Sequence, residues 1–135
     1  MILFLDACII IYWVESKEPF HSQVMKVLRN LKSKDPEATF AVSRLSLLEC
    51  QVVPLREKNH PLEEAYKELF SMGELEIVEL DASIIERATQ IRASLNLRTP
   101  DAIQASSALS LGDKVLFITG DDKFKKVSGL QVLCL

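Results

Sequence analysis

The stretch that decides the fold is residues 1–14, MILFLDACIIIYWV. Its first part, Ile2–Leu5, is a short apolar run typical of a buried β-strand, and a second apolar run, Ile9–Val14, follows closely. Asp6 stands at the end of the first run. A carboxylate in this setting loses hydration when the chain folds, and a buried charge without compensation costs several kcal/mol. We therefore expect other groups to compensate the negative charge of Asp6. This makes Asp6 the first candidate for a functional residue.

The composition is typical of one soluble globular domain. The 135 residues, 48% of them hydrophobic and 26% charged, suffice for a core in a single domain over residues 1–135. No apolar stretch approaches the roughly 20 residues of a membrane-spanning helix, and the N-terminal run lacks the basic leader of a signal peptide. A cytoplasmic location is expected. The three cysteines have no close pairing that would indicate a disulfide framework or a zinc motif.

Short β-like runs alternate with helical patterns along the whole chain. Runs rich in Val, Ile, Leu or Phe predict five strands: Met1–Leu5, Thr39–Val42, Leu75–Leu80, Val115–Ile118 and Gln131–Cys134. Apolar stripes and helix start and stop residues predict helices that contain Phe20–Leu31, the segment after Ser43, Leu62–Phe70, Ile84–Leu95 and the segment from Thr99 to Gly112. This alternation predicts an α/β fold, a three-layer α/β/α sandwich with a central, mostly parallel five-stranded sheet.

Two acidic residues follow predicted strands directly. Asp6 follows the first strand, and Asp121 follows the strand that begins at Val115. In parallel sheets covered by helices, ligands bind beyond the carboxyl ends of the strands. We therefore expect Asp6 and Asp121 to lie at one edge of the sheet, provided that the strand order brings their strands together.

Two further acids complete the candidate set, and each also has a purely structural explanation. Glu49 shares a helix face with Leu45 and Val52, where a carboxylate is unexpected, although it could instead pair with Arg44 or Arg56. Asp101 lies in the first turn of a helix expected to be capped by Thr99, where the helix dipole alone favours a negative charge. Asp121 likewise fits ordinary turn chemistry in Gly120-Asp121-Asp122.

Four carboxylates that meet in space repel one another unless protons or metal ions lie between them. Mg²⁺ and Mn²⁺ favour such oxygen ligands, and paired ions can activate a water and stabilise the leaving oxygen of a phosphodiester. No serine lies in a nucleophile elbow, and no glycine-rich phosphate loop or dinucleotide motif is present. The acids therefore indicate a small nuclease that depends on Mg²⁺ or Mn²⁺, with Asp6, Glu49, Asp101 and Asp121 as metal-binding, catalytic residues.

The chain resembles the PIN domain family, and in particular its short VapC-type toxins. The resemblance rests on four pieces in the family's order: Phe4-Leu5-Asp6, Ser46-Leu47-Leu48-Glu49-Cys50, Thr99-Pro100-Asp101-Ala102-Ile103 and Thr119-Gly120-Asp121. It implies a PIN-like fold and an endoribonuclease that leaves a 5′-phosphate. It also implies a homodimer that is blocked by a cognate VapB-type antitoxin.

The resemblance assigns the four acids to metal binding and Thr119 to their orientation. The chain departs from the family where Ala7 and Cys8 replace the usual hydroxyl or amide residues after the first Asp. A lost hydroxyl weakens the orientation of the carboxylates, which favours an alternative: a weak or inactive PIN module that binds RNA or a protein partner. Asp122 competes with Asp121 for the place of the fourth acid.

Basic residues close to the acids are candidates for binding RNA, although the net charge of −3 argues against binding through bulk positive charge. We expect phosphates to contact one or more of four side chains, which could also form an ordinary solvated face: Arg98, Lys123, Lys125 and Lys126. The segment Ile9–Val14 is apolar all round, so it belongs to the core or, together with the Phe20–Leu31 helix, receives the antitoxin.

Overall fold

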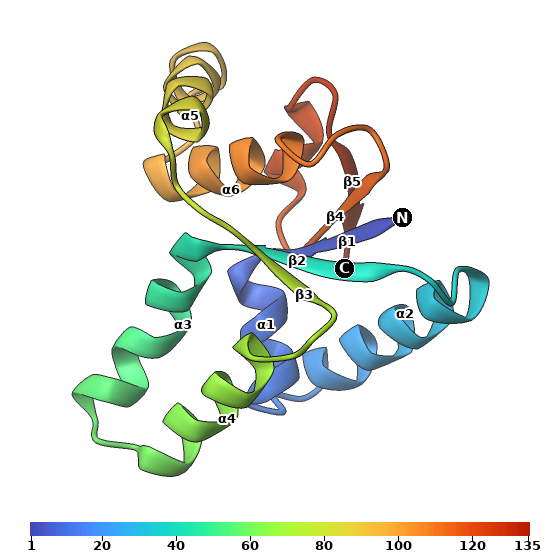
Figure 1. The fold of residues 1–135 in the computed structure, drawn as a ribbon, viewed down its shortest axis with the longest axis vertical. Helices are drawn as coiled ribbons and strands as arrows, with labels where there is room; N and C mark the ends of the chain where they lie inside the picture. The colour runs from blue at the N-terminus through green and yellow to red at the C-terminus, as the bar shows by residue number, and fades with distance from the viewer.

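The computed structural model describes all residues, 1–135, and contains one sheet of five parallel strands (Figure 1). The order across the sheet is β3-β2-β1-β4-β5. The strands are β1 (Ile2–Leu5), β2 (Thr39–Ser43), β3 (Leu75–Val78), β4 (Val115–Thr119) and β5 (Gln131–Cys134). Because β1 lies in the centre, both of its neighbours arrive later in the chain, and the sheet is complete only when β4 and β5 have been added.

Helices cover both faces of the sheet, which confirms the predicted three-layer α/β/α sandwich. The helices are α1 (Ala7–Val14), α2 (Phe20–Lys34), α3 (Arg44–Arg56), α4 (His60–Phe70), α5 (Ala82–Leu95), α6 (Thr99–Leu109) and the short 3₁₀ helix η1 (Asp122–Lys126). In Figure 1, α1 to α4 lie on one side of the sheet, and α5 and α6 lie on the other. None of these helices is long and apolar enough to cross a membrane.

The alternation of side chains along β1 divides the core into two parts. Leu3 and Leu5 are buried with residues of α1, α2 and α4, whereas Phe4 points to the opposite face. There Phe4 stacks on Phe117 of β4, with ring centroids 5.4 Å apart, beside residues of α6. Each fully buried side chain of this size contributes about 1.5–3 kcal/mol. A strand that is apolar on both faces is therefore fixed in the centre of the sheet.

Some boundaries differ from the predicted ones. The apolar segment that follows Asp6 forms α1, with Ile9 and Ile10 in the core. Helix α6 begins at Thr99 itself, after Arg98, so Thr99 is not its cap, and the helix ends at Leu109 instead of Gly112. The β3 strand stops at Val78 instead of Leu80. These differences lie at element ends, where local sequence specifies structure least.

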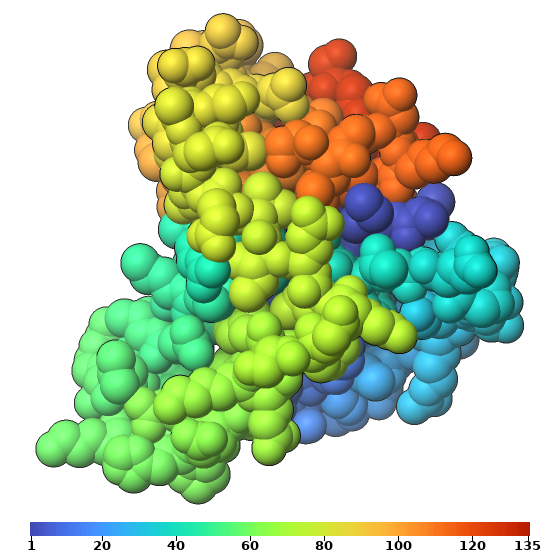
Figure 2. Space-filling model, in the orientation of Figure 1, coloured from blue at the N-terminus to red at the C-terminus, as the bar shows by residue number.

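The space-filling view shows how the two halves meet at the β3 side of the molecule. The surface of α3 and α4 and the surface of α5 project as separate lobes, and the β3 segment lies between them (Figure 2). At the sheet itself, the parallel register pairs Leu5 of β1 with Ile118 of β4. The residues that follow these two strands therefore emerge side by side at one edge, and this edge carries the candidate site.

Candidate metal centre

A cleft of about 310 Å³ opens at the carboxyl edge of the sheet. All four acids that the sequence singled out line it, although they come from four different elements: Asp6, Glu49, Asp101 and Asp121. Its other lining residues include Cys8, Tyr12, Arg98, Gly120 and Lys123. The fold thus brings together carboxylates that are far apart in the chain.

Asp6 is held at the junction of β1 and α1. Its backbone N–H donates to the Ile118 carbonyl at 3.0 Å, and its side chain caps α1 by accepting from the Ala7 N–H at 2.9 Å. The residue is only 9% exposed. Burial raises the pKa of the Asp6 carboxyl, and the nearby charges of Glu49 and Asp101 raise this pKa further, against the opposing effect of its hydrogen bonds. Asp6 therefore lies where a positive charge would be stabilising.

Thr119 is a fully buried hydroxyl that connects two of the acids. It donates to Oδ2 of Asp6 at 2.7 Å and accepts from the backbone N–H of Asp121 at 3.1 Å. Its place at the end of β4, next to β1, sets both contacts. The Thr119 side chain thus orients the buried Asp6 and fixes the turn that carries Asp121.

Glu49 is positioned by a residue that the sequence reasoning missed. Gln104 of α6 is buried, and its side-chain N–H₂ group donates to Glu49 Oε1 at 3.0 Å and to Ser46 Oγ at 2.8 Å. Arg44 pairs with Glu79 instead, so the structural alternative for Glu49 through Arg44 is not observed. Gln104 lies three residues after Asp101, on the same helix face, and this spacing is the pattern that could have identified it.

Asp101 and Asp121 share one cation. The Nζ atom of Lys123 lies 2.9 Å from Oδ2 of Asp101 and 2.9 Å from Oδ2 of Asp121. Arg98 lies farther from Asp101, at 3.5 Å, and is largely exposed. The hydrogen bond and the charge of Lys123 hold the pKa of Asp121 below its usual range. Lys123 therefore contacts carboxylates, and in this arrangement it is not free at the rim.

The types of ligand atom in the cleft suit a hard divalent cation. Oδ2 of Asp101 is buried and accepts no hydrogen bond of good geometry, so its compensation is ionic only. The acidic side chains that line the cleft carry carboxylate oxygens, which suit Mg²⁺ and Mn²⁺. No three acidic, histidine or cysteine side chains are arranged to hold one ion together as they stand. The cation position between Asp101 and Asp121 is taken by the lysine.

Cys8 lies beside Asp6 where the sequence lacks the usual hydroxyl. Its Sγ atom is 3.7 Å from Asp6 Oδ2 and accepts a hydrogen bond from the Gly120 N–H at 3.4 Å. Burial, followed by the charge of Asp6, raises the pKa of the thiol to about 11, so at neutral pH it remains a thiol. Cys8 thus links the first turn of α1 to the turn after β4, and Thr119 supplies the hydroxyl hydrogen bond to Asp6.

Other candidates lie outside the cleft. Asp122 is exposed and does not line it, whereas Asp121 does. Lys125 is exposed and makes no ion pair, and Lys126 lines a separate depression beside α5. These positions give no support to a role for Asp122 as the fourth acid. They leave Arg98 as the basic residue most open to a phosphate at the rim.

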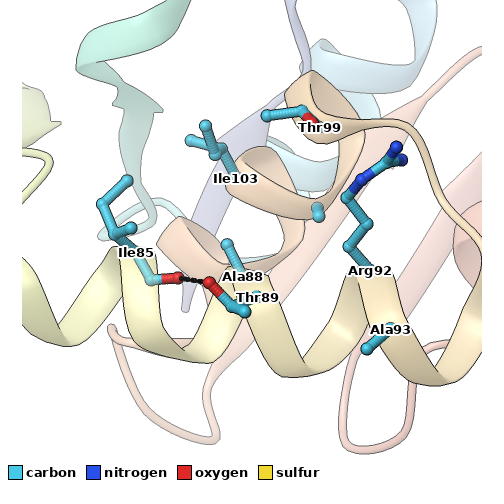
Figure 3. Close-up of a pocket in the computed structure, with 8 residues that line it drawn as sticks. Ile85, Ala88, Thr89, Arg92, Ala93, Thr99 and Ile103 are labelled. Atoms are coloured by element: carbon cyan, nitrogen blue, oxygen red, sulfur yellow. Dashed lines mark hydrogen bonds between the residues drawn. The ribbon is translucent and has the colours of Figure 1, made fainter.

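A second cavity, of about 390 Å³, lies between α5 and α6 and carries no acid (Figure 3). Its wall includes the apolar side chains of Ile85 and Ile103, and the Thr89 hydroxyl there donates to the Ile85 carbonyl of its own helix. The cavity offers apolar surface and a single charged side chain, Arg92. The acidic chemistry is confined to the cleft at the sheet edge.

Comparison with solved structures shows the same fold in toxin–antitoxin complexes. VapBC2 from Rickettsia felis, bound to a promoter DNA fragment, has a TM-score of 0.75 at 21% identity, over 99% of this chain and 98% of the other. VapBC-1 from nontypeable Haemophilus influenzae has the same TM-score, identity and coverage. A toxin–antitoxin complex from Klebsiella pneumoniae has a TM-score of 0.74 at 20% identity, over 97% of this chain and 95% of the other.

Comparison with curated protein sequences gives no match. The family comparison is decisive, because the PIN domain matches residues 3–130 and so covers nearly the whole chain, including all four acids. Members of this family are in general nucleases. The matched region, together with the parallel sheet and its acidic edge, leads to one assignment: the chain belongs to the PIN domain family.

Proposed function

We propose that this chain is a VapC-type endoribonuclease that depends on Mg²⁺ or Mn²⁺ and hydrolyses RNA phosphodiesters. The observation that carries the proposal is that Asp6, Glu49, Asp101 and Asp121 line one cleft in a PIN domain chain. The fold shared with toxin–antitoxin complexes supports the toxin assignment. A cytoplasmic location, where RNA and an antitoxin would both be present, is part of the same proposal.

Each residue of the cleft has a separate role in the proposal. Asp6 and Asp101 are the principal ligands in the proposal, and Glu49 and Asp121 complete the negative charge. Thr119 holds Asp6 in one orientation through its 2.7 Å hydrogen bond. Arg98 lies at the exposed rim, where it can hold a phosphate that flanks the scissile bond. The chemistry that a bound divalent ion supplies is the activation of a water for attack on the phosphodiester.

The test is cleavage of a mixed RNA pool by the wild type and by Asp101→Asn, with Mg²⁺, with Mn²⁺ and with a chelator. We expect metal-dependent cleavage by the wild type and none by the variant. Asp113→Asn is the matched control, because Asp113 is an exposed acid outside the cleft. Equal cleavage by wild type and Asp101→Asn would refute the site. The same pool made as single-stranded DNA distinguishes an endoribonuclease from a general nuclease.

The second candidate function is a catalytically weak PIN module that acts by binding RNA or a protein partner. It is favoured by Ala7 and Cys8, which offer no hydroxyl to the acids. The Thr119 hydroxyl and the Ala7 N–H both reach Asp6, however, so this carboxylate keeps two good donors. The orientation that a lost hydroxyl would weaken is therefore maintained. RNA binding without cleavage under every metal condition would favour this second candidate.

The proposed antitoxin site is the apolar groove beside Trp13, which is formed with α4 and not with the Phe20–Leu31 helix that the sequence suggested. Trp13 packs edge-on against Phe40 of the core but also lines a groove of about 390 Å³ with Val14, Leu69 and Met72. An apolar groove beside a half-buried aromatic ring is a common site for a partner segment. We expect the fluorescence of Trp13, the only tryptophan, to change when the cognate VapB-type antitoxin is added. An unchanged spectrum in a complex that demonstrably forms would remove Trp13 from this interface.

The homodimer is also a proposal. Helix α3 exposes Leu48 and Leu55, which are 64% and 67% accessible and lie on one face with Val52. An exposed apolar stripe of this kind indicates a surface that is covered by a second protein. We expect light scattering to give a dimer for the wild type and the 15.2 kDa monomer for Leu55→Asp. A monomeric wild type would refute the proposal.

A further inference from the structure

Lys123 forms ion pairs with two of the four acids in the cleft. Its ammonium group lies between two carboxylates of the cleft, 2.9 Å from Asp101 Oδ2 and 2.9 Å from Asp121 Oδ2. Asp101 Oδ2 is buried and has no hydrogen bond of good geometry, so this oxygen depends on the charge of the lysine. A group that bridges two site acids in this way takes the place that a bridging cation would take.

The backbone fixes the lysine in this position. Lys123 is the second residue of η1, and its backbone N–H donates to Oδ1 of Asp121 at 3.0 Å. Both oxygens of Asp121 are therefore engaged by the same residue, Oδ1 by its backbone and Oδ2 by its side chain. The side chain is only 31% exposed. The ammonium group is thus tethered, in contrast to the ammonium of Lys125, which is exposed and makes no ion pair.

The four acids fall into two pairs that differ in compensation. Asp101 and Asp121 have Lys123, and Asp101 also has Arg98. Asp6 and Glu49 have no basic side chain within 4.0 Å and are held only by neutral donors, Thr119 for Asp6 and Gln104 for Glu49. A compensating positive charge is therefore still missing beside Asp6, Glu49 and Oδ1 of Asp101, since the ion pairs of Lys123 and Arg98 fall on Oδ2 of Asp101.

The charge balance of the cleft also favours a single divalent ion. Four carboxylates, with Lys123 and Arg98 beside them, leave two net negative charges when all are ionised. One divalent ion neutralises these charges, whereas a second ion would leave the cleft positive and would compete with an ammonium for the same oxygens. A second ion between Asp101 and Asp121 would need the Oδ2 atoms that Lys123 already contacts.

We propose that Lys123 is a tethered cation that replaces a second metal ion between Asp101 and Asp121, so that the cleft binds a single divalent ion. Lys123 is a positioning residue in this scheme, because it holds two acids in place and supplies a fixed positive charge. The inference rests on the proposed metal-dependent function. In this scheme Lys123 binds carboxylates, whereas the sequence suggested that it contacts a phosphate at the rim.

The first test counts Mn²⁺ ions by calorimetry and by electron paramagnetic resonance, with folding checked by circular dichroism. We expect one ion per chain for the wild type and for Lys123→Arg, which keeps the charge, and two ions for Lys123→Met, which removes it. Lys125→Met is the matched control, since it removes the same charge from the same short helix, and it is expected to bind one ion. An equal number of ions for the wild type and Lys123→Met would overturn the inference, as would two ions in the wild type.

The second test needs no substitution and uses an amine-reactive reagent on the wild type, read by mass spectrometry. Lys123 is expected to react several-fold more slowly than Lys125, both without Mn²⁺ and at saturating Mn²⁺. A rate for Lys123 that rises to that of Lys125 on metal addition would mean that the metal displaces the lysine, which overturns the inference. A failure of the inference is distinct from a failure of the proposed function, because only the latter predicts no Mn²⁺ binding by the wild type.

Discussion

The role of Thr119 gives a prediction whose size follows from the contacts. Thr119→Val keeps the shape of a fully buried side chain but removes the hydroxyl that donates to Asp6 at 2.7 Å and accepts from Asp121 N–H at 3.1 Å. A hydrogen bond to a charged group contributes about 1.5–3 kcal/mol, and a neutral one contributes about 0.5–1.5 kcal/mol. Because some water can reach the exposed turn at Asp121, we expect the free energy of unfolding to fall by about 2–3 kcal/mol at neutral pH.

The pH dependence of this loss has a definite sign. The Thr119 hydroxyl stabilises the ionised form of Asp6, so its removal raises the pKa of a carboxyl that burial already raises. The difference in stability between the wild type and Thr119→Val is therefore largest above the folded pKa of Asp6. It shrinks as the pH is lowered into the range where Asp6 takes up its proton.

Urea denaturation without divalent metal, at neutral and at acidic pH, measures this effect. Thr89→Val is the matched control, because Thr89 is exposed on α5 and its hydroxyl donates only to the Ile85 carbonyl of the same helix. The control is expected to change the free energy of unfolding by no more than about 0.5 kcal/mol. If Thr119→Val changes it no more than the control does, the hydroxyl does not hold Asp6 and the reasoning fails.

Four further predictions concern the same region and its support. Asp6→Asn keeps the helix cap but removes a carboxyl whose pKa is raised in the folded protein. The wild type loses stability as the pH rises and this carboxyl ionises, so the metal-free variant should be more stable than the wild type at neutral pH. In urea titrations this gain should shrink as the pH is lowered. A variant that is less stable at both pH values would contradict this. Gln104→Leu frees Glu49 and should weaken Mn²⁺ binding about tenfold in calorimetry with the circular dichroism spectrum unchanged, whereas unaltered affinity would mean that Glu49 needs no such support. Tyr66→Phe removes the hydroxyl that donates to Glu15 and should lower the free energy of unfolding by about 1–2 kcal/mol, with Mn²⁺ binding unaltered; an unchanged urea midpoint would show that water replaces the bond. Mn²⁺ at 100 times its dissociation constant should stabilise the wild type by about 2.7 kcal/mol in thermal melts, and a chelator should reverse the gain; an equal gain in Asp101→Asn would place the ion elsewhere.

The sequence predicted what depends on local patterns. The apolar runs on either side of Asp6 identified both a strand and an acid that folding would bury, and the structure has both. The alternation of strands and helices was enough to predict the layered parallel fold. The element ends were less certain, as at Thr99, because a threonine before a proline fits the cap position and the first helical position equally well.

The contacts between distant residues could not be predicted from sequence. Gln104 reaches Glu49 across 55 positions, and Lys123 reaches Asp101 only because β4 returns beside β1. The sequence suggested that Lys123 contacts a phosphate. A lysine close to acids in the sequence can face solvent or bridge carboxylates, and the sequence does not distinguish the two. The roles of the four acids, of Thr119 and of Arg98 stay predictions, which the variants above test.

The central place of β1 also bears on when the protein can act during its own synthesis. Asp6 is made more than 100 residues before its hydroxyl donor, Thr119, and before Asp121, the last of the four acids along the chain. A nascent chain still lacking β4 has an unpaired edge on β1 and no complete cleft. Under the proposed function, a nascent chain therefore cannot cut RNA until the segment through Asp121 has left the ribosome and folded.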